Sequence, residues 1–362
     1  MPVLFRGGYY SWLLKRADRF GCKGNSRRCL ILMYHRVTSR LTGICARSGE
    51  IADTQCGISR QNFEMQMQFL REHMNPVSLS FLVKSLQNRT PIPPRSVVVT
   101  FDDGYADNYF NAYPILKKYG IPATIFLVTS YISTGKRFWW DQLRAIVQHN
   151  PSLPMILEKH CLLPPHVLSK WLSGGPRSYD ELAESLISHI WRNQNMCPDQ
   201  LIDLLAGGTG SAASGGQAFD GGSSSDGDYA SLTWEQVQEM NRHDLEFGSH
   251  TVSHPNMVHL SSAKVEEELR ISKKVIEKHL GCPVEGFAYP IGQGEHYDTR
   301  IKSLVQKAGF TYACTAQLGC IYPEKWDILS LNRIPPPNSL PCFVRDISHY
   351  LTLPCPGAGS FR

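Results

Sequence analysis

The fold is decided by the stretch Val97-Val98-Val99-Thr100-Phe101-Asp102-Asp103-Gly104-Tyr105, in which an apolar run ends on two carboxylates and a glycine. Three consecutive β-branched valines indicate a strand that is buried on both faces, as in parallel sheets. Because unpaired charge is costly to bury, Asp102 and Asp103 are expected at the carboxyl end of this strand, where the active sites of parallel sheets and barrels lie. A simple Asp-Asp-Gly turn between a strand and a helix is the alternative.

A second short apolar run, Leu245-Glu246-Phe247-Gly248-Ser249, leads into the segment His250-Thr251-Val252-Ser253-His254-Pro255. Two histidines four residues apart on a helical turn project to the same side, so that both imidazoles reach one ion. A carboxylate and two imidazoles are a usual ligand set for a catalytic zinc, which keeps positions open for water and substrate. Solvated or capping histidines are the commoner alternative, but two strand-end clusters of complementary chemistry favour a metal site.

Apolar runs at residues 29–37, 97–101 and 123–128 alternate with amphipathic segments. This alternation predicts an α/β fold, in which crossover helices join parallel strands.

The two strand-end segments resemble motifs of a known family. Thr100–Tyr105 is similar to the first motif of the polysaccharide deacetylases, the NodB/chitin deacetylase homology group, and Ser249–Pro255 is similar to the second. Phe287-Ala288-Tyr289-Pro290-Ile291-Gly292 stands at the third, in a form that resembles the exopolysaccharide branch. The resemblance covers residues 31–140 and 231–335. It implies an irregular (β/α) barrel of the NodB type.

The resemblance also implies roles for single residues. Asp103, His250 and His254 are expected to bind Zn²⁺ or another divalent cation, and Asp102 to act as the general base. Such an ion polarises a carbonyl and lowers the pKa of bound water toward ~7. The backbone N–H of Ile291 is the expected donor to the oxyanion.

This sequence departs from the family pattern at two points. Many relatives carry an arginine in the third motif that holds the catalytic aspartate, but Ala288 occupies that position here. Arg333 is a candidate to supply the charge, or else an ordinary strand-end arginine. Many relatives also use a late Leu-x-His histidine as general acid, and His349 and the strand-end His35 are the two candidates here; His35 is equally well read as a histidine satisfied by local backbone.

The implied reaction is removal of N-acetyl groups from amino sugars of an oligo- or polysaccharide or of a glycan precursor. The motif residues Tyr105, Tyr289 and Pro290 are expected to contact this substrate. Trp140 is a further candidate, since an aromatic face suits a sugar ring, although core packing is the favoured alternative. O-acetyl ester or other amide hydrolysis on the same scaffold, and a non-catalytic carbohydrate-binding relative, are the competing functions.

Composition shifts suggest how the chain is organised. We expect an N-terminal basic segment at 1–28, a catalytic domain at 29–345 and a C-terminal tail at 346–362. Residues 142–230 are interpreted as an insertion that starts with helical character, and its Gly/Ser-rich part, 206–228, cannot bury a core. A tolerated surface insertion is favoured over a lid.

The composition excludes several classes of protein. Hydrophobic residues make up 42% of the 362 residues and charged residues 19%, as in globular proteins, and a net charge of +5 gives no reason to expect a nucleic-acid partner. An odd number of cysteines, 11, without CxxC pairs predicts reduced thiols in the cytoplasm. Neither a signal-peptide h-region nor a transmembrane run is visible, so we expect an intracellular precursor as substrate. Residues 9–20 are a candidate for peripheral membrane contact, with a packed or solvated helix favoured.

Overall fold

The computed structural model describes residues 28–39, 57–150, 153–160, 169, 173, 177–192, 198–206, 229–323 and 325–353. The candidate membrane contact at residues 9–20 and almost all of the Gly/Ser-rich stretch lie outside these ranges.

A parallel sheet forms the centre of the molecule. Its main path has the order β1-β5-β6-β7-β8-β9-β10, and the short strand β4 (Asn75–Pro76) pairs with the start of β5. The bounds of the path strands are β1 Cys29–Tyr34, β5 Ser96–Phe101, β6 Ala123–Leu127, β7 Glu246–Ser249, β8 Gly286–Ala288, β9 Tyr312–Leu318 and β10 Leu331–Arg333. Every pairing along the path is parallel, as the β-α-β alternation predicts.

The sheet curls until its two edges meet. Just after β10, Ile334 accepts a hydrogen bond from Met33 N–H at 2.9 Å and donates one to Ile31 O at 2.8 Å, so the chain joins β1 beyond the end of the last strand. The result is the nearly closed, irregular (β/α) barrel that the sequence predicts.

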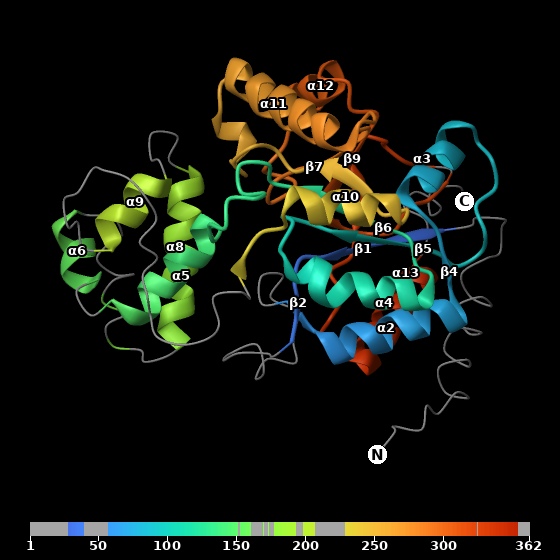
Figure 1. Cartoon of the computed structure of the whole chain (residues 1–362), viewed down its shortest axis with the longest axis horizontal. Coiled ribbons are helices and arrows are strands. Elements are labelled where there is room, and N and C mark those ends of the chain that lie inside the picture. The colour runs from blue at the N-terminus through green and yellow to red at the C-terminus, as the bar shows by residue number, and fades with distance from the viewer. Residues whose placement is uncertain are drawn as a thin grey trace, which may run out of the picture.

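Helices surround the barrel (Figure 1). They are α2 (Arg60–His73), α3 (Leu79–Gln87), α4 (Tyr113–Tyr119), α10 (Trp234–Arg242), α11 (Ser262–Leu280), α12 (Thr299–Lys307) and α13 (Leu340–Thr352), with the short turns η2 (Asn108–Ala112) and η4 (Met257–His259). A small parallel pair, β2 (Val37–Thr38) and β3 (Ile58–Ser59), lies apart from the barrel sheet. Helix α13 crosses the expected tail boundary at residue 346, because its apolar side chains Phe343, Val344 and Ile347 are buried in the main core.

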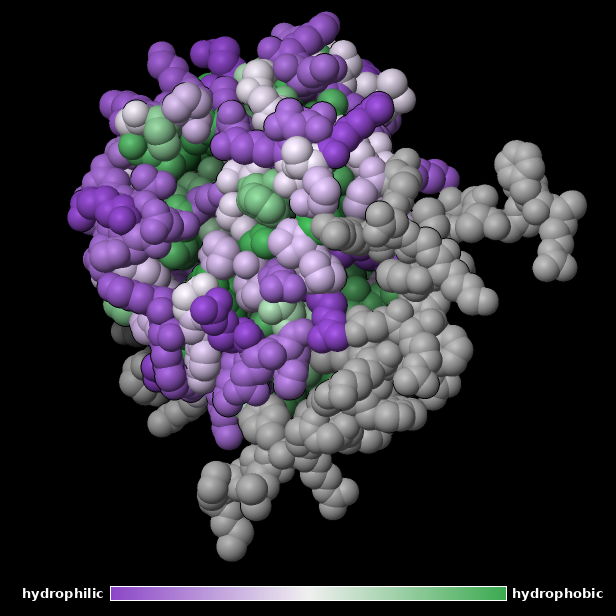
Figure 2. All heavy atoms as spheres, turned by 90° about the vertical axis from the view of Figure 1, so that its right-hand side faces the viewer, coloured by the Kyte–Doolittle hydropathy of each residue, from purple (hydrophilic) through white to green (hydrophobic). Residues whose placement is uncertain are grey.

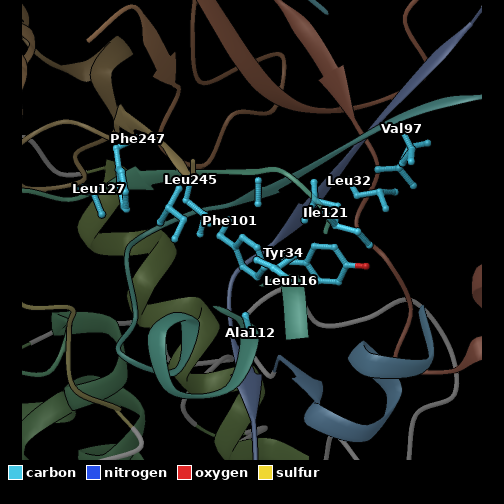
Figure 3. Close-up of a cluster of buried hydrophobic side chains, with 14 of the residues drawn as sticks. Leu32, Tyr34, Val97, Phe101, Ala112, Leu116, Ile121, Leu127, Leu245 and Phe247 are labelled. Atoms are coloured by element: carbon cyan, nitrogen blue, oxygen red, sulfur yellow. The ribbon is translucent and has the colours of Figure 1, made fainter. Parts of the chain in front are cut away.

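Alternate residues of the strands fill two different cores, which is the period-2 pattern of a strand buried on both faces. Leu32 and Phe101 belong to the core between the sheet and the outer helices, and Figure 3 shows Phe101 near Leu116 of α4. Ile31 and Val98 belong to a second cluster, which also contains apolar residues of α3. The uninterrupted burial of β1 and β5 explains why β-branched and aromatic side chains dominate them.

A helical lobe follows β6 in the chain and lies to one side of the barrel (Figure 1). It contains α5 (Trp139–His149), α6 (Leu153–Lys159), α8 (Arg177–Arg192) and α9 (Pro198–Leu205). These helices bury an apolar cluster of their own, which includes Leu143, Leu186 and Leu205. Helix α5 begins at Trp139, three residues before residue 142, where the insertion was expected to start. Its first residues, Trp139, Trp140 and Asp141, therefore join the lobe to the barrel.

The face of the molecule turned toward the viewer in Figure 2 is mainly hydrophilic, with small scattered apolar patches. Within the part of the chain that the structure describes, no helix combines the length and the hydropathy needed to cross a bilayer.

Candidate active site

The two carboxylates follow β5 at its carboxyl end, where the sequence predicts them. Asp102 N–H still continues the pairing with β1, donating to Tyr34 O at 2.9 Å. Asp103 then adopts a φ of 72°, in the left-handed region that non-glycine residues seldom occupy. This sharp turn gives two neighbouring carboxylates different surroundings.

Asp103 lies beside both histidines of the second motif. Its Oδ1 is 3.7 Å from His250 Nε2 and 3.8 Å from His254 Nε2. One ligand atom from each residue lies within 4.8 Å of the others, and all three side chains are buried. Asp103 Oδ1 accepts no hydrogen bond within the described residues, although it is shielded from water. A cation shared by the three atoms would satisfy this oxygen, so the residues fit the expected metal.

The tautomer of His250 also suits a metal ligand. Its Nδ1 lies 2.8 Å from Ala288 O, and because a carbonyl only accepts, Nδ1 carries the proton. The lone pair of His250 Nε2 therefore faces Asp103 and His254, which is the usual way in which a protein fixes a ligating imidazole.

The prediction of a helical turn, which rests on the spacing of the two histidines, is wrong. Residues 250–256 have no regular structure, and Thr251 and His254 have φ values of 69° and 58°. Thr251 Oγ1 accepts His254 N–H at 3.0 Å and helps to fix this loop. The two imidazoles thus meet because the loop folds back, and not because of an i,i+4 helical spacing.

Four non-glycine residues of this region have left-handed backbones: Asp103, Thr251, His254 and Ile291. Each such residue costs on the order of 1–3 kcal/mol, and residues of this kind cluster at functional sites. Their grouping here indicates a region shaped for ligand binding at the expense of local stability.

Burial controls the protonation of the three expected ligands. It raises the pKa of the Asp103 carboxyl well above its usual range, and the charges of Asp102 and Asp141 add to this rise. Burial also lowers the pKa of His250, and it lowers that of His254 well below its ordinary value, where repulsion from His250 contributes. The imidazoles are therefore neutral at pH 7, which is the form that binds metal.

Asp102 has a different partner, Arg333 at the end of β10. Arg333 Nη1 donates to Asp102 Oδ1 at 2.7 Å and Nη2 to Asp102 Oδ2 at 2.6 Å, a bidentate pair with both side chains at most 3% exposed. Burial alone would raise the pKa of Asp102, but Arg333 and then His250 outweigh it and hold the pKa below its usual range. Arg333 thus occupies the charge position that Ala288 leaves empty in the third motif.

Ile291 adopts a φ of 62°, and no hydrogen bond engages its N–H within the described ranges. Gly292 follows with a φ of 65°, and a Cβ there would lie 2.7 Å from Ala316 N. Only glycine allows so close an approach to β9, so Gly292 fixes the peptide that precedes it.

The two candidate general acids lie in different places. His35 follows β1 and is close enough to Asp102 and His254 to influence the pKa of both. His349 is exposed on α13, with its ring 5.6 Å from that of Tyr350, and no contact of the described residues brings it to the motif residues. The helix that carries it packs on α2, at the outside of the barrel.

All four expected substrate contacts are buried. Tyr105 O–H donates to Asp141 Oδ2 at 2.7 Å and accepts Trp140 Nε1–H at 2.9 Å. The Trp140 ring is buried 4.8 Å from the ring of His254, so it packs on a predicted ligand.

Tyr289 donates to Leu329 O at 2.9 Å and stacks on Tyr297 inside the core. Pro290 is buried as well. The side chain of Tyr289 is therefore a core residue in this structure, because its hydroxyl finds a partner away from the site.

Comparison with known proteins is consistent with this geometry. A sequence profile described as polysaccharide deacetylase matches residues 89–153 and 219–313, on both sides of the helical insertion. Over these residues the chain is similar to the polysaccharide deacetylase family. YxkH of Bacillus subtilis, named for this family, is 32% identical over 127 residues, which are 34% of this chain and 40% of that protein. A poly-β-1,6-N-acetyl-D-glucosamine N-deacetylase of Staphylococcus epidermidis is 35% identical over 118 residues, 31% of this chain and 40% of its own length. The matches thus span about two fifths of these relatives.

Solved structures share the fold of this protein. The deacetylase PplD of Streptococcus pyogenes, solved in complex with acetate, superposes with a TM-score of 0.55 at 20% identity, over 90% of this chain and 98% of that one. IcaB from Ammonifex degensii gives a TM-score of 0.54 at 18% identity, over the same shares of the two chains. These likenesses confirm the predicted NodB-type barrel.

Sequence reasoning missed two buried acidic residues of this site. Asp141 accepts from Tyr105, and its only sequence signal is its place after two tryptophans. Glu268 of α11 contacts the histidine loop. Glu268 lies on the same face of the helix as the buried Val265 and Ser272. An acidic residue on the inward face of an amphipathic helix was therefore the signal that the sequence offered.

Proposed function

We propose that this protein is a polysaccharide deacetylase, a metal-dependent hydrolase that removes N-acetyl groups from amino sugars of an oligo- or polysaccharide or of a glycan precursor. One observation carries the proposal. Asp103 Oδ1 is buried without a hydrogen-bond donor among the described residues, 3.7 and 3.8 Å from two imidazole nitrogens, and the next carboxylate is held by an arginine. The site thus combines a set of metal ligands with a separate carboxylate that can act as a base. A closed structural zinc site has no need of such a base.

A divalent cation held by Asp103, His250 and His254 would polarise the acetyl carbonyl and lower the pKa of a neighbouring water. The protein residues supply the rest of the chemistry. Asp102 is ionised at neutral pH because Arg333 opposes the effect of burial, so it can accept the proton of the attacking water. The bidentate guanidinium also fixes the direction of this carboxylate.

The same arrangement offers groups for the later steps. Attack on the carbonyl creates an oxyanion, to which the N–H of Ile291 would donate. The leaving amine needs a proton, and His35 is the favoured donor because it lies close enough to influence the pKa of both Asp102 and His254. His349, exposed on α13, is the weaker candidate.

The relatives support the proposed substrate class. The Staphylococcus epidermidis relative is named for deacetylation of poly-β-1,6-N-acetyl-D-glucosamine, so an acetylated amino sugar is the first substrate to test. Membrane contact through residues 9–20 and a cytoplasmic location are further proposals from the sequence, which cell fractionation would test.

The decisive experiment measures acetate release from N-acetylglucosamine oligomers before chelation, after chelation and after zinc is added back. Activity should disappear and return. Asp102→Asn should lose most activity while it still binds metal, whereas Asp203→Asn, at an exposed position of α9, should match the wild type. Acetate from O-acetylated xylan alone would indicate an ester hydrolase, and metal binding without any acetate would indicate a carbohydrate-binding relative.

A further inference from the structure

The loop that carries both predicted histidine ligands is held from the barrel side by backbone hydrogen bonds. Thr129 N–H donates to Thr251 O at 3.2 Å, and Ser130 N–H donates to Val252 O at 3.0 Å. These bonds use the carbonyls of the loop and leave its N–H groups to be satisfied from another direction.

Glu268 of α11 supplies the partners for those N–H groups. Its Oε2 accepts Val252 N–H at 2.7 Å and Ser253 N–H at 3.0 Å, and its Oε1 accepts the Ser253 hydroxyl at 2.8 Å. The Glu268 side chain is 6% exposed and makes no ion pair within the described residues. All three donors therefore belong to Val252 and Ser253, the two residues that directly precede His254.

A carboxylate suits this place for a chemical reason. The two backbone N–H groups and the hydroxyl all donate, so an acceptor with two oxygens is needed to satisfy them. Hydrogen bonds to an ionised carboxylate are also stronger than neutral ones. Glutamine would keep the shape of the side chain but would turn an NH₂ toward at least one of these donors.

We propose that Glu268 is a positioning residue that fixes the loop between His250 and His254, and thereby sets the affinity of the site for its cation. The inference rests on the proposed metal site, because it concerns the spacing of the ligands. It adds a residue outside the three motifs, on a helix that packs against β7.

The test is the affinity of the purified full chain for Zn²⁺ alone, measured by competition with a chromophoric chelator. Loss of such supporting contacts typically weakens metal binding about 10–100-fold, so Glu268→Ala should fall in this range and Glu268→Gln near its lower end. Ser253→Ala removes one of the three donors and should weaken binding about 2–10-fold. Glu266→Gln, at an exposed position of the same helix, is the matched control and should bind as the wild type does.

A second readout separates positioning from general stability. Thermal unfolding in excess chelator measures how much the mispaired amide of Glu268→Gln destabilises the metal-free protein relative to Glu266→Gln, while the spectrum of bound Co²⁺ should change in Glu268→Gln and stay unchanged in Glu266→Gln. Equal Zn²⁺ affinity of wild type, Glu268→Gln and Ser253→Ala would overturn the inference and leave the proposed function intact. If the wild type binds no metal, the inference and the proposed function both fail, whereas normal metal binding without acetate release overturns only the function.

Discussion

Replacing Arg333 by methionine tests the pairing on which the proposed base depends. The guanidinium and the Asp102 carboxylate are 1% and 3% exposed, and two hydrogen bonds of 2.6 and 2.7 Å join them. Removing one partner of such a buried pair leaves the other charge uncompensated, which costs about 3–5 kcal/mol. We expect Arg333→Met to lose this much free energy of unfolding.

Urea unfolding in excess chelator measures this loss without a contribution from bound metal. Arg345→Met is the matched control, because Arg345 pairs with Asp346 at 3.0 Å but is 71% exposed. Exposed pairs contribute about 0–1 kcal/mol, so the control should stay close to the wild type. An Arg333→Met variant as stable as the control would refute the reasoning.

The pair also predicts two pH effects. Because the pKa of Asp102 is held below its unfolded value of about 3.9, the ion pair contributes stability that is present above that pH and is lost as the pH falls through the folded value. In Arg333→Met, burial is left largely unopposed and raises the pKa of Asp102. The acid limb of acetate release should therefore move to higher pH in this variant, and an unmoved limb would argue against Asp102 as the base.

Three further predictions concern other parts of the structure. Chelation should lower the melting temperature and zinc should restore it, because a ligand that binds only the folded state stabilises it; equal melting curves would count against the site. Gly292→Ala should destabilise the protein more than Gly281→Ala, since both residues have positive φ but only Gly292 has a backbone atom, 2.7 Å away, in the place of the new Cβ. In the native protein at pH 8, iodoacetamide should label the exposed Cys282 but not Cys314, whose pKa burial raises to about 12; peptide mapping that finds both labelled would contradict this burial.

The sequence by itself determined the strands and the place of the motifs. Runs of β-branched residues such as those of β5 can form little else than a buried strand, and adjacent charges such as Asp102 and Asp103 must lie at its end. These features depend on a few neighbouring residues, so local patterns are enough to predict them. The family resemblance then supplied the roles of the motif residues.

Tertiary structure decided how these residues meet. Arg333 is 231 residues from Asp102, and only the closure of β10 onto β1 brings the two together. The spacing of His250 and His254 suggested a helical turn, but hydrogen bonds that Glu268 accepts, and others that the residues between β6 and α5 donate, hold a loop there instead. Contacts of this kind depend on strand register and helix packing across the whole chain, whereas a local pattern reports only which backbone conformations its own residues prefer.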